Sequence, residues 1–184
     1  EARVKIAKQL EESVVATLRM LGMEDAQFVV DVTETESYTP LGMDSVAYLF
    51  TANRTTKPGA VERIASGGEL SRIMLALKAL IAEKRMLPTV IFDEIDTGVS
   101  GSVANAVGEV IAELSATMQV IDITHLPQIA SKGDRHYLVY KSDSTTNMRQ
   151  LTDSERITEI AKMLSGDSVT EAAIAQAQIL LGTK

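Results

Sequence analysis

The stretch "ERIASGGELSRIMLALKAL" spans residues 62–80 and opens the strongest helical pattern in the chain. Two adjacent glycines, Gly67 and Gly68, stand directly before the apolar periodicity, where glycine costs backbone entropy and contributes no packing. Glycine does leave the backbone N–H groups open to close approach, and the N-terminus of a helix attracts anions. The turn therefore predicts a phosphate contact at the start of a helix over residues 69–86.

The same turn also fits a purely structural role. Ser66 as N-cap, with Glu69 three residues further on, has the pattern of a capping box, which satisfies free N–H groups at a helix start. This accounts for the serine and the glutamate, but it does not require two glycines between them, whereas phosphate approach does.

Composition limits the function classes that the chain can belong to. The 184 residues carry a net charge of −7 with a sequence pI of about 4.9, 45% apolar residues and no cysteine. The length suggests about one to one and a half domains, with enough apolar residues for a core. An acidic balance argues against broad electrostatic binding of nucleic acid, and the lack of cysteine excludes disulfides and cysteine-based zinc sites.

The two ends of the chain carry no targeting pattern. No apolar run approaches the roughly 20 residues of a membrane span, and no signal peptide leads the chain. The first residue is Glu1 and not methionine, so we expect a piece of a longer protein.

Residues 1–22 form an apolar seam with helical spacing, interrupted by Glu11 and followed by Gly22 as a C-cap. The seam consists of Val4, Ala7, Val14, Leu18 and Leu21. Three heptads are short for a free coiled coil. The segment is therefore either the end of a longer coiled coil or an amphipathic packing helix.

Strand-like segments alternate with helices along the rest of the chain. Residues 26–34 and 45–53 are rich in β-branched or aromatic residues, and the turn residues between them predict an antiparallel pair. We expect a loop over 54–60. Near the C-terminus, we expect strands over 136–141 and 148–151 to form a hairpin that precedes two helices.

The segment "TVIFDE" (89–94) reads as a strand buried on both faces of a parallel sheet. A helix over 101–117 and a second buried strand, "QVIDITH" (119–125), follow it. This strand–helix–strand order implies a parallel crossover, so the fold class is α/β, with parallel core strands flanked by helices and additional antiparallel strands. Asp122 interrupts the second strand without an explanation at the level of sequence.

Acidic residues end the first of these strands. In an open α/β sheet, ligands bind at the carboxyl ends of the strands, and a carboxylate such as Asp93 can hold Mg²⁺ directly or through water. Glu94, one residue on, points elsewhere and can orient or deprotonate a water. The alternative is that both acids merely solvate a strand end.

His125 closes the second strand, which should lie beside the first and bring the imidazole close to Asp93 and Glu94. A neutral imidazole can hydrogen-bond a phosphate oxygen or an attacking water. The alternative is a structural histidine at a strand end, and this is the role we assign to His136. The chain contains no G-x-x-x-x-G-K-S/T phosphate loop.

Each pattern is weak alone, but their order and spacing are specific. "ASGGE" (65–69), "TVIFDE" (89–94), "IDTGVSG" (95–101) and "ITH" (123–125) together resemble the C-terminal lobe of the head of ABC-type P-loop ATPases. Glutamate in the signature and the coiled-coil-like start are similar to the SMC branch. The resemblance covers nearly the whole chain and is closest to the bacterial SMC-like ATPases of DNA double-strand-break repair.

The resemblance implies a role for each matching residue. Asp93 would coordinate Mg²⁺ through water, Glu94 would polarise the attacking water, and His125 would sense the γ-phosphate of ATP. A further set would contact the ATP held by a partner head: Ser66, Gly67, Gly68, Glu69 and, in the loop after the strand, Asp96. Arg72 would lie at the same interface.

The resemblance also implies partners. The phosphate loop would lie on an N-terminal lobe of the same protein, two heads would form a homodimer around ATP, and the full-length protein would bind DNA at the bacterial nucleoid in the cytoplasm. Residues 1–22 would be the returning end of a coiled coil and residues 23–184 the lobe itself. This chain alone would then lack ATPase activity.

Two other functions stay open. The chain can be a non-catalytic interaction module that docks on partners without binding ATP tightly, which the missing phosphate loop supports. It can also be the head lobe of another SMC-type or transporter ATPase. "DTGVSG" (96–101) and the N-terminal seam argue against a transporter.

Overall fold

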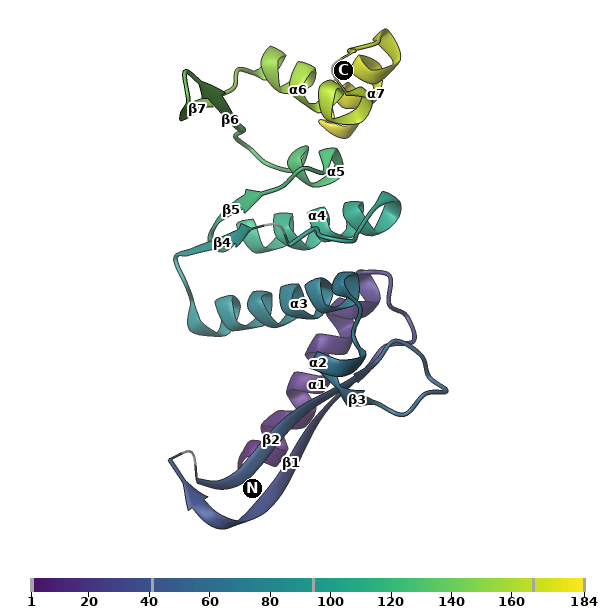
Figure 1. The fold of residues 1–184 in the computed structure, drawn as a ribbon, viewed down its shortest axis with the longest axis vertical. Helices are drawn as coiled ribbons and strands as arrows, with labels where there is room; N and C mark the ends of the chain where they lie inside the picture. The colour runs from purple at the N-terminus through teal and green to yellow at the C-terminus, as the bar shows by residue number, and fades with distance from the viewer. Residues whose placement is uncertain (1, 41, 94, 167, 184) are drawn as a thin grey trace. The chain divides into compact units, whose positions relative to one another are not determined.

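The computed structural model describes residues 2–40, 42–93, 95–166 and 168–183. The chain forms two compact units, each described by itself below (Figure 1). Unit 1 comprises Glu1–Leu87 and Thr97–Val99, and unit 2 comprises Pro88–Asp96 and Ser100–Lys184.

The described residues of unit 1 form three strands in the order β1-β2-β3 and three helices. They are α1 (Ala2–Met20), β1 (Gln27–Thr39), β2 (Gly42–Thr51), β3 (Gly59–Ala60), α2 (Val61–Ile64) and α3 (Gly67–Arg85). The predicted antiparallel pair is confirmed, with Phe28 opposite Phe50. The hairpin is longer than predicted, because after an irregularity between Glu34 and Thr39 the pairing resumes with Thr39 opposite Gly42. The loop predicted over residues 54–60 was wrong at its end, where β3 pairs with β2.

Helix α1 packs its apolar seam on β1 and α3. Val14 and Leu18 are fully buried, whereas Val4 is 53% exposed, so the seam is covered only beyond the first turns. Glu11, which interrupts the seam, accepts a hydrogen bond from the backbone N–H of Val30 at 2.8 Å. Gly22 ends the helix with φ +77°, a left-handed conformation that glycine adopts at little cost.

The core of unit 1 lies between α1, α3 and the hairpin. The largest side chains in it are Phe28, Phe50, Leu18 and Ile73, all at most 3% exposed. Burying a side chain of this size contributes about 1.5–3 kcal/mol. This packing fixes the start of α3, where the glycine turn lies.

In unit 2, the part of the chain that the structure describes forms a parallel pair of strands, a hairpin and four helices. They are β4 (Thr89–Asp93), α4 (Gly101–Ser115), β5 (Gln119–Ile123), α5 (Pro127–Ala130), β6 (Tyr137–Ser142), β7 (Thr145–Gln150), α6 (Asp153–Ser165) and α7 (Glu171–Leu180). The parallel pairing of β4 with β5 and the β6–β7 hairpin are both confirmed. Helices α6 and α7 pack on each other around Ile160 and Ala177.

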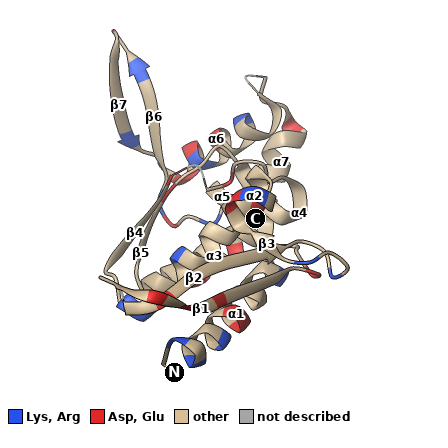
Figure 2. Cartoon of the chain, turned by 60° about the horizontal axis from the view of Figure 1, so that its bottom comes forward, with Lys and Arg blue, Asp and Glu red and all other residues tan. Residues whose placement is uncertain are grey.

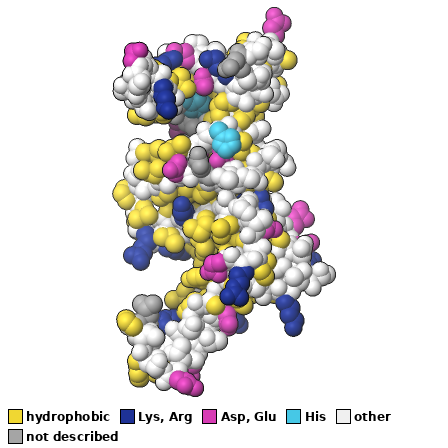
Figure 3. Space-filling view, in the orientation of Figure 1, with side chains coloured by type: hydrophobic (Ala, Val, Ile, Leu, Met, Phe, Trp, Pro, Cys, Tyr) yellow, Lys and Arg dark blue, Asp and Glu magenta, His cyan; other side chains and the backbone are white. Residues whose placement is uncertain are grey.

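The prediction that β4 and β5 are buried on both faces was wrong. Phe92 is fully buried, but Ile91, Ile121 and Ile123 are 59%, 44% and 52% exposed. Alternate residues of a strand point to opposite faces, so these isoleucines share the face opposite to Phe92. In the view of Figure 3, hydrophobic side chains lie open to solvent over the region of β4 and β5. The difference arises because the described elements of unit 2 cover only one face of this strand pair.

Charged residues are distributed over several elements. Figure 2 shows basic residues on α1, on α3 and on the β6–β7 hairpin, with acidic residues among those of α1. In the part of the chain that the structure describes, no helix is both long and apolar enough to cross a membrane.

Candidate functional site

The turn that opens α3 forms the capping box expected from its sequence. The backbone N–H of Glu69 donates to the Ser66 hydroxyl at 3.4 Å, and the backbone N–H of Ser66 donates to the Glu69 carboxylate at 2.7 Å. The Ser71 hydroxyl also donates to the carbonyl of Gly67 at 3.1 Å. The structural role of Ser66 and Glu69 is therefore confirmed, and it occupies the Glu69 carboxylate.

The two glycines of this turn differ in their surroundings. A Cβ placed on Gly68 would lie 2.9 Å from the carbonyl oxygen of Gly98, which is closer than real Cβ atoms approach. A Cβ placed on Gly67 would meet nothing within 4 Å. Gly68 is thus required by the packing of two backbone segments in unit 1. Gly67 leaves open backbone at the helix start, where an anion is favoured.

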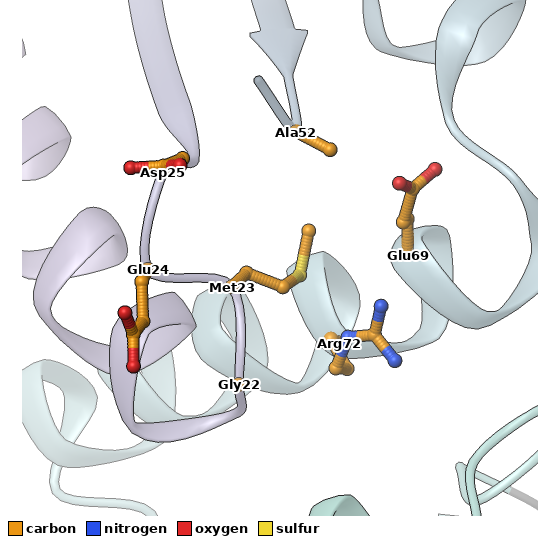
Figure 4. Close-up of a pocket in the computed structure, with 7 residues that line it drawn as sticks. All are labelled: Gly22, Met23, Glu24, Asp25, Ala52, Glu69 and Arg72. Atoms are coloured by element: carbon orange, nitrogen blue, oxygen red, sulfur yellow. The ribbon is translucent and has the colours of Figure 1, made fainter. Parts of the chain in front are cut away.

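A shallow pocket lies beside this turn, also in unit 1 (Figure 4). Its volume is about 380 Å³, and it is lined by Gly22, Met23, Glu24, Asp25, Ala52, Glu69 and Arg72. Met23 reaches into it from the turn after α1, and Glu69 and Arg72 approach it from α3 (Figure 4). The Nε atom of Arg72 is buried and has no hydrogen-bond partner among the described residues. The pocket therefore carries charge of both signs next to the glycine turn.

In unit 2, the candidate residues lie at the carboxyl ends of β4 and β5. Asp93 is opposite Ile123 in the parallel register, so the two strands end at the same edge. The side chain of Asp93 is exposed. Glu94, predicted to act on the attacking water, lies outside the described residues.

A magnesium ion at this edge of the sheet would find few protein ligands. Among the described residues, no three His, Asp or Glu side chains form a group that could hold a metal. Mg²⁺ in phosphate-transferring sites uses one or two carboxylates together with waters and substrate phosphates. A single exposed carboxylate, Asp93, therefore fits a magnesium ion that arrives with a nucleotide.

Asp96, Thr124 and His125 form a connected cluster in unit 2. The Thr124 hydroxyl donates a short hydrogen bond to the Asp96 carboxylate, which is only 1% exposed. The same hydroxyl accepts the backbone N–H of Leu126 at 3.0 Å. The His125 Nδ1 atom lies 3.6 Å from the Oδ2 atom of Asp96, and its side chain is 71% exposed. The structure thus joins two residues that the sequence singled out separately.

Asp122 is a further buried acid in this region. Both of its carboxylate oxygens are buried without a hydrogen-bond partner among the described residues. Burial and, second, the nearby charge of Asp96 raise the pKa of Asp122 to about 6. An interruption of an apolar strand by an acid was the only indication of this in the sequence. The sequence did not indicate the hydrogen bond of Thr124 with Asp96 or the close approach of Gly98 to Gly68, since these partners are distant in sequence.

His136, by contrast, lies among structural contacts. Burial lowers its pKa, and the charge of Arg156 lowers it further. The Arg156 side chain donates to the backbone carbonyls of Gly133 and Asp134 at 2.7 and 3.2 Å. His136 itself hydrogen-bonds to the backbone of Ala130 and Gly133, which suits the structural role assigned to it.

The arrangement of elements defines the class of protein. An SMC chain solved in work on "ATP-driven dimerization and DNA stimulated activation of SMC ATPases" matches 91% of this chain and 98% of its own length, with a TM-score of 0.67 and 16% identity. The Smc head with coiled coil and joint from Pyrococcus yayanosii matches 89% of this chain and 30% of its own length, with a TM-score of 0.71 and 18% identity. The chain has the fold of an SMC ATPase head domain.

Sequence comparison then names the particular relatives. "DNA repair protein RecN" of Rickettsia bellii is 42% identical over 97% of this chain, and that of Haemophilus influenzae is 38% identical over 98%. RecN of Halalkalibacterium halodurans is 42% identical over 97%. The chain is therefore a homologue of RecN, and it spans about a third of the length of these curated relatives. No protein-family model matches it.

Proposed function

We propose that this chain is the C-terminal lobe of an ATP-hydrolysing, SMC-like head that acts in DNA double-strand-break repair and recombination. The observation that carries the proposal is the shared edge of β4 and β5. This edge holds Asp93 on one strand and leads from the other strand directly to His125. Phosphoryl transfer depends on positioning and charge stabilisation, which such an edge provides.

At this edge each residue has a separate task. Asp93 would hold Mg²⁺, which would supply positive charge to the phosphates of ATP. Glu94 orients and deprotonates the attacking water. His125, whose side chain is exposed, donates a hydrogen bond to the γ-phosphate.

A second surface, the turn at the start of α3, contacts the ATP bound to a partner head. Gly67 supports this, because its backbone is open and lies at the N-terminus of a 19-residue helix. Ser66, Gly68 and Glu69 shape the turn through the capping box and the contact with Gly98. Arg72 lies one turn further on and contacts the same partner head; its Nε atom has no hydrogen-bond partner among the described residues.

The complete protein therefore needs more than this chain. The phosphate loop comes from an N-terminal lobe, a second head completes the homodimer, and DNA is bound by the full-length protein in the cytoplasm. Residues 1–22 lead from the returning coiled coil into the lobe. A site split over lobes and heads would hydrolyse ATP only after correct assembly.

A second candidate is a non-catalytic interaction module. The exposed isoleucines of β4 and β5 favour it, because a contiguous apolar face of this kind marks a surface that another element covers. The same face is also expected of a lobe that docks on its N-terminal half, so activity must separate the two candidates.

The test is steady-state ATP hydrolysis by this chain mixed with its separately produced N-terminal lobe. We expect activity only on mixing, its loss in Glu94→Gln, and its retention in the matched control Glu113→Gln. Glu113 lies exposed near the end of α4. Full activity of Glu94→Gln would exclude the proposed role of Glu94. Lobes that associate without any hydrolysis would favour the interaction module.

A further inference from the structure

We propose that Asp96 and Thr124 form a buried positioning pair that fixes the backbone and the imidazole orientation of His125. The part that concerns ATP rests on the proposed function above, whereas the positioning itself does not depend on it.

The two residues that flank His125 are both hydrogen-bonded through the Thr124 hydroxyl. Thr124 precedes His125 and donates its hydroxyl proton to Asp96. Leu126 follows His125 and donates its backbone N–H to that same hydroxyl at 3.0 Å. Because one hydroxyl links the carboxylate to the residue on each side, the backbone at His125 has little freedom to rotate.

Burial strengthens the hydrogen bond to Asp96. Asp96 is 1% exposed, so its carboxylate is surrounded by protein and shielded from solvent. Hydrogen bonds to a charged, desolvated group are stronger than those between neutral groups. The distance in sequence between Asp96 and Thr124 is 28 residues, so the pair also ties the loop after β4 to the end of β5.

The Asp96 carboxylate also favours one tautomer of the His125 imidazole. The Nδ1 atom of His125 lies 3.6 Å from the Oδ2 atom of Asp96, while 71% of the side chain is exposed. A proton on Nδ1 is favoured next to the carboxylate. Nε2 then accepts a hydrogen bond from a ligand while the ring is neutral, and it donates to a phosphate when the ring carries a second proton. Asp96 thus acts on the imidazole of His125 as a positioning residue.

The direct test uses the ring tautomer of His125. The chain has only two histidines, so ¹⁵N–¹H correlation spectra in alkaline buffer resolve both rings, and His125→Gln assigns the signals. We expect mainly the Nδ1–H tautomer of His125 in the wild type. In Asp96→Asn and in Thr124→Val, the ratio of Nδ1–H to Nε2–H should fall by about twofold or more.

Two controls keep this test specific. Thr124→Ser retains the hydroxyl and should preserve the wild-type ratio, whereas Thr124→Val keeps the shape and loses the hydroxyl. The signal of His136, which lies in the same unit, reports whether a variant is folded. An unchanged His125 ratio in folded Asp96→Asn and Thr124→Val would overturn the positioning pair.

A second measurement separates this inference from the proposed function. In the assembled ATPase, Thr124→Val should lower kcat more than it raises KM, and it should cause little further loss in a His125→Ala background, because coupled residues are not additive. Full additivity would overturn the inference. If the tautomer shifts as expected but no assembly hydrolyses ATP, the proposed function fails and the positioning pair stands.

Discussion

Two pairs of apolar residues, one in each unit, have opposite environments. Phe28 and Phe50 face each other across β1 and β2 and are 3% and 0% exposed. Ile91 and Ile121 face each other across β4 and β5 and are 59% and 44% exposed. Helices α1 and α3 cover the first pair, whereas the second lies on a face that no described element of its unit buries. The comparison shows that an apolar cross-strand pair predicts a face to be covered and does not say which chain covers it.

The largest effect should come from breaking the covered pair. Phe50→Ala removes a fully buried ring, and such truncations cost about 3–5 kcal/mol of unfolding free energy, because a cavity remains. Chemical denaturation of the wild type and the variant measures this loss of unfolding free energy. The matched change on the open face, Ile121→Ala, should cost less than about 1 kcal/mol. Similar losses at both positions would mean that the open face is covered in solution.

The two glycines of the α3 turn allow the same comparison of a packed and an open position within unit 1. Gly68→Ala should destabilise the chain by about 1–3 kcal/mol, because its Cβ would overlap the carbonyl oxygen of Gly98. Gly67→Ala, with open space around it, should change stability by less than about 1 kcal/mol in either direction. Thermal unfolding of both variants checks this. In the assembled ATPase, Gly67→Ala should still weaken hydrolysis, and normal activity would exclude Gly67 as a nucleotide contact.

Asp122 should make the stability of the chain depend on pH. Its pKa is raised from 3.8 to about 6, so the folded state binds the proton more tightly than the unfolded state. Stability is therefore lost as pH rises from about 4 to about 6 and stays reduced above that range. Asp122→Asn should restore about 1 kcal/mol at pH 8, a figure reduced for solvent screening, and almost nothing at pH 4. Denaturation at both pH values measures the difference, and an equal effect at both would contradict the assignment.

The smallest effect concerns the cap of α3. Ser66→Ala removes the acceptor of the Glu69 N–H and should cost about 1 kcal/mol or somewhat less. Ser66→Thr retains the hydroxyl and should recover most of that stability. Urea midpoints of the three proteins compare them. A stable Ser66→Ala variant would show that the capping box contributes little to folding.

Much of the fold was predictable because it depends on short-range patterns. The capping box joins residues three apart, the turn after α1 needs a glycine at Gly22, and the parallel order of β4 and β5 follows from the strand–helix–strand pattern. The extension of β1 to Thr39 was missed, because polar residues there pair across a hairpin without an apolar pattern. The candidate site was predictable in part: Asp93 and His125 were expected near one sheet edge, and the structure ends both strands there.

The sequence alone determined the local elements, the order of the motifs and the resemblance to SMC-type ATPases, because capping, turn formation and strand periodicity depend on neighbouring residues. Only the tertiary structure decided three features. These are the contact of Gly68 with Gly98, the burial of Asp96 with its hydrogen bond from Thr124, and the exposure of the isoleucines on β4 and β5. Each depends on which distant segments pack together. Packing is a property of the folded chain as a whole, so no short window of sequence contains it.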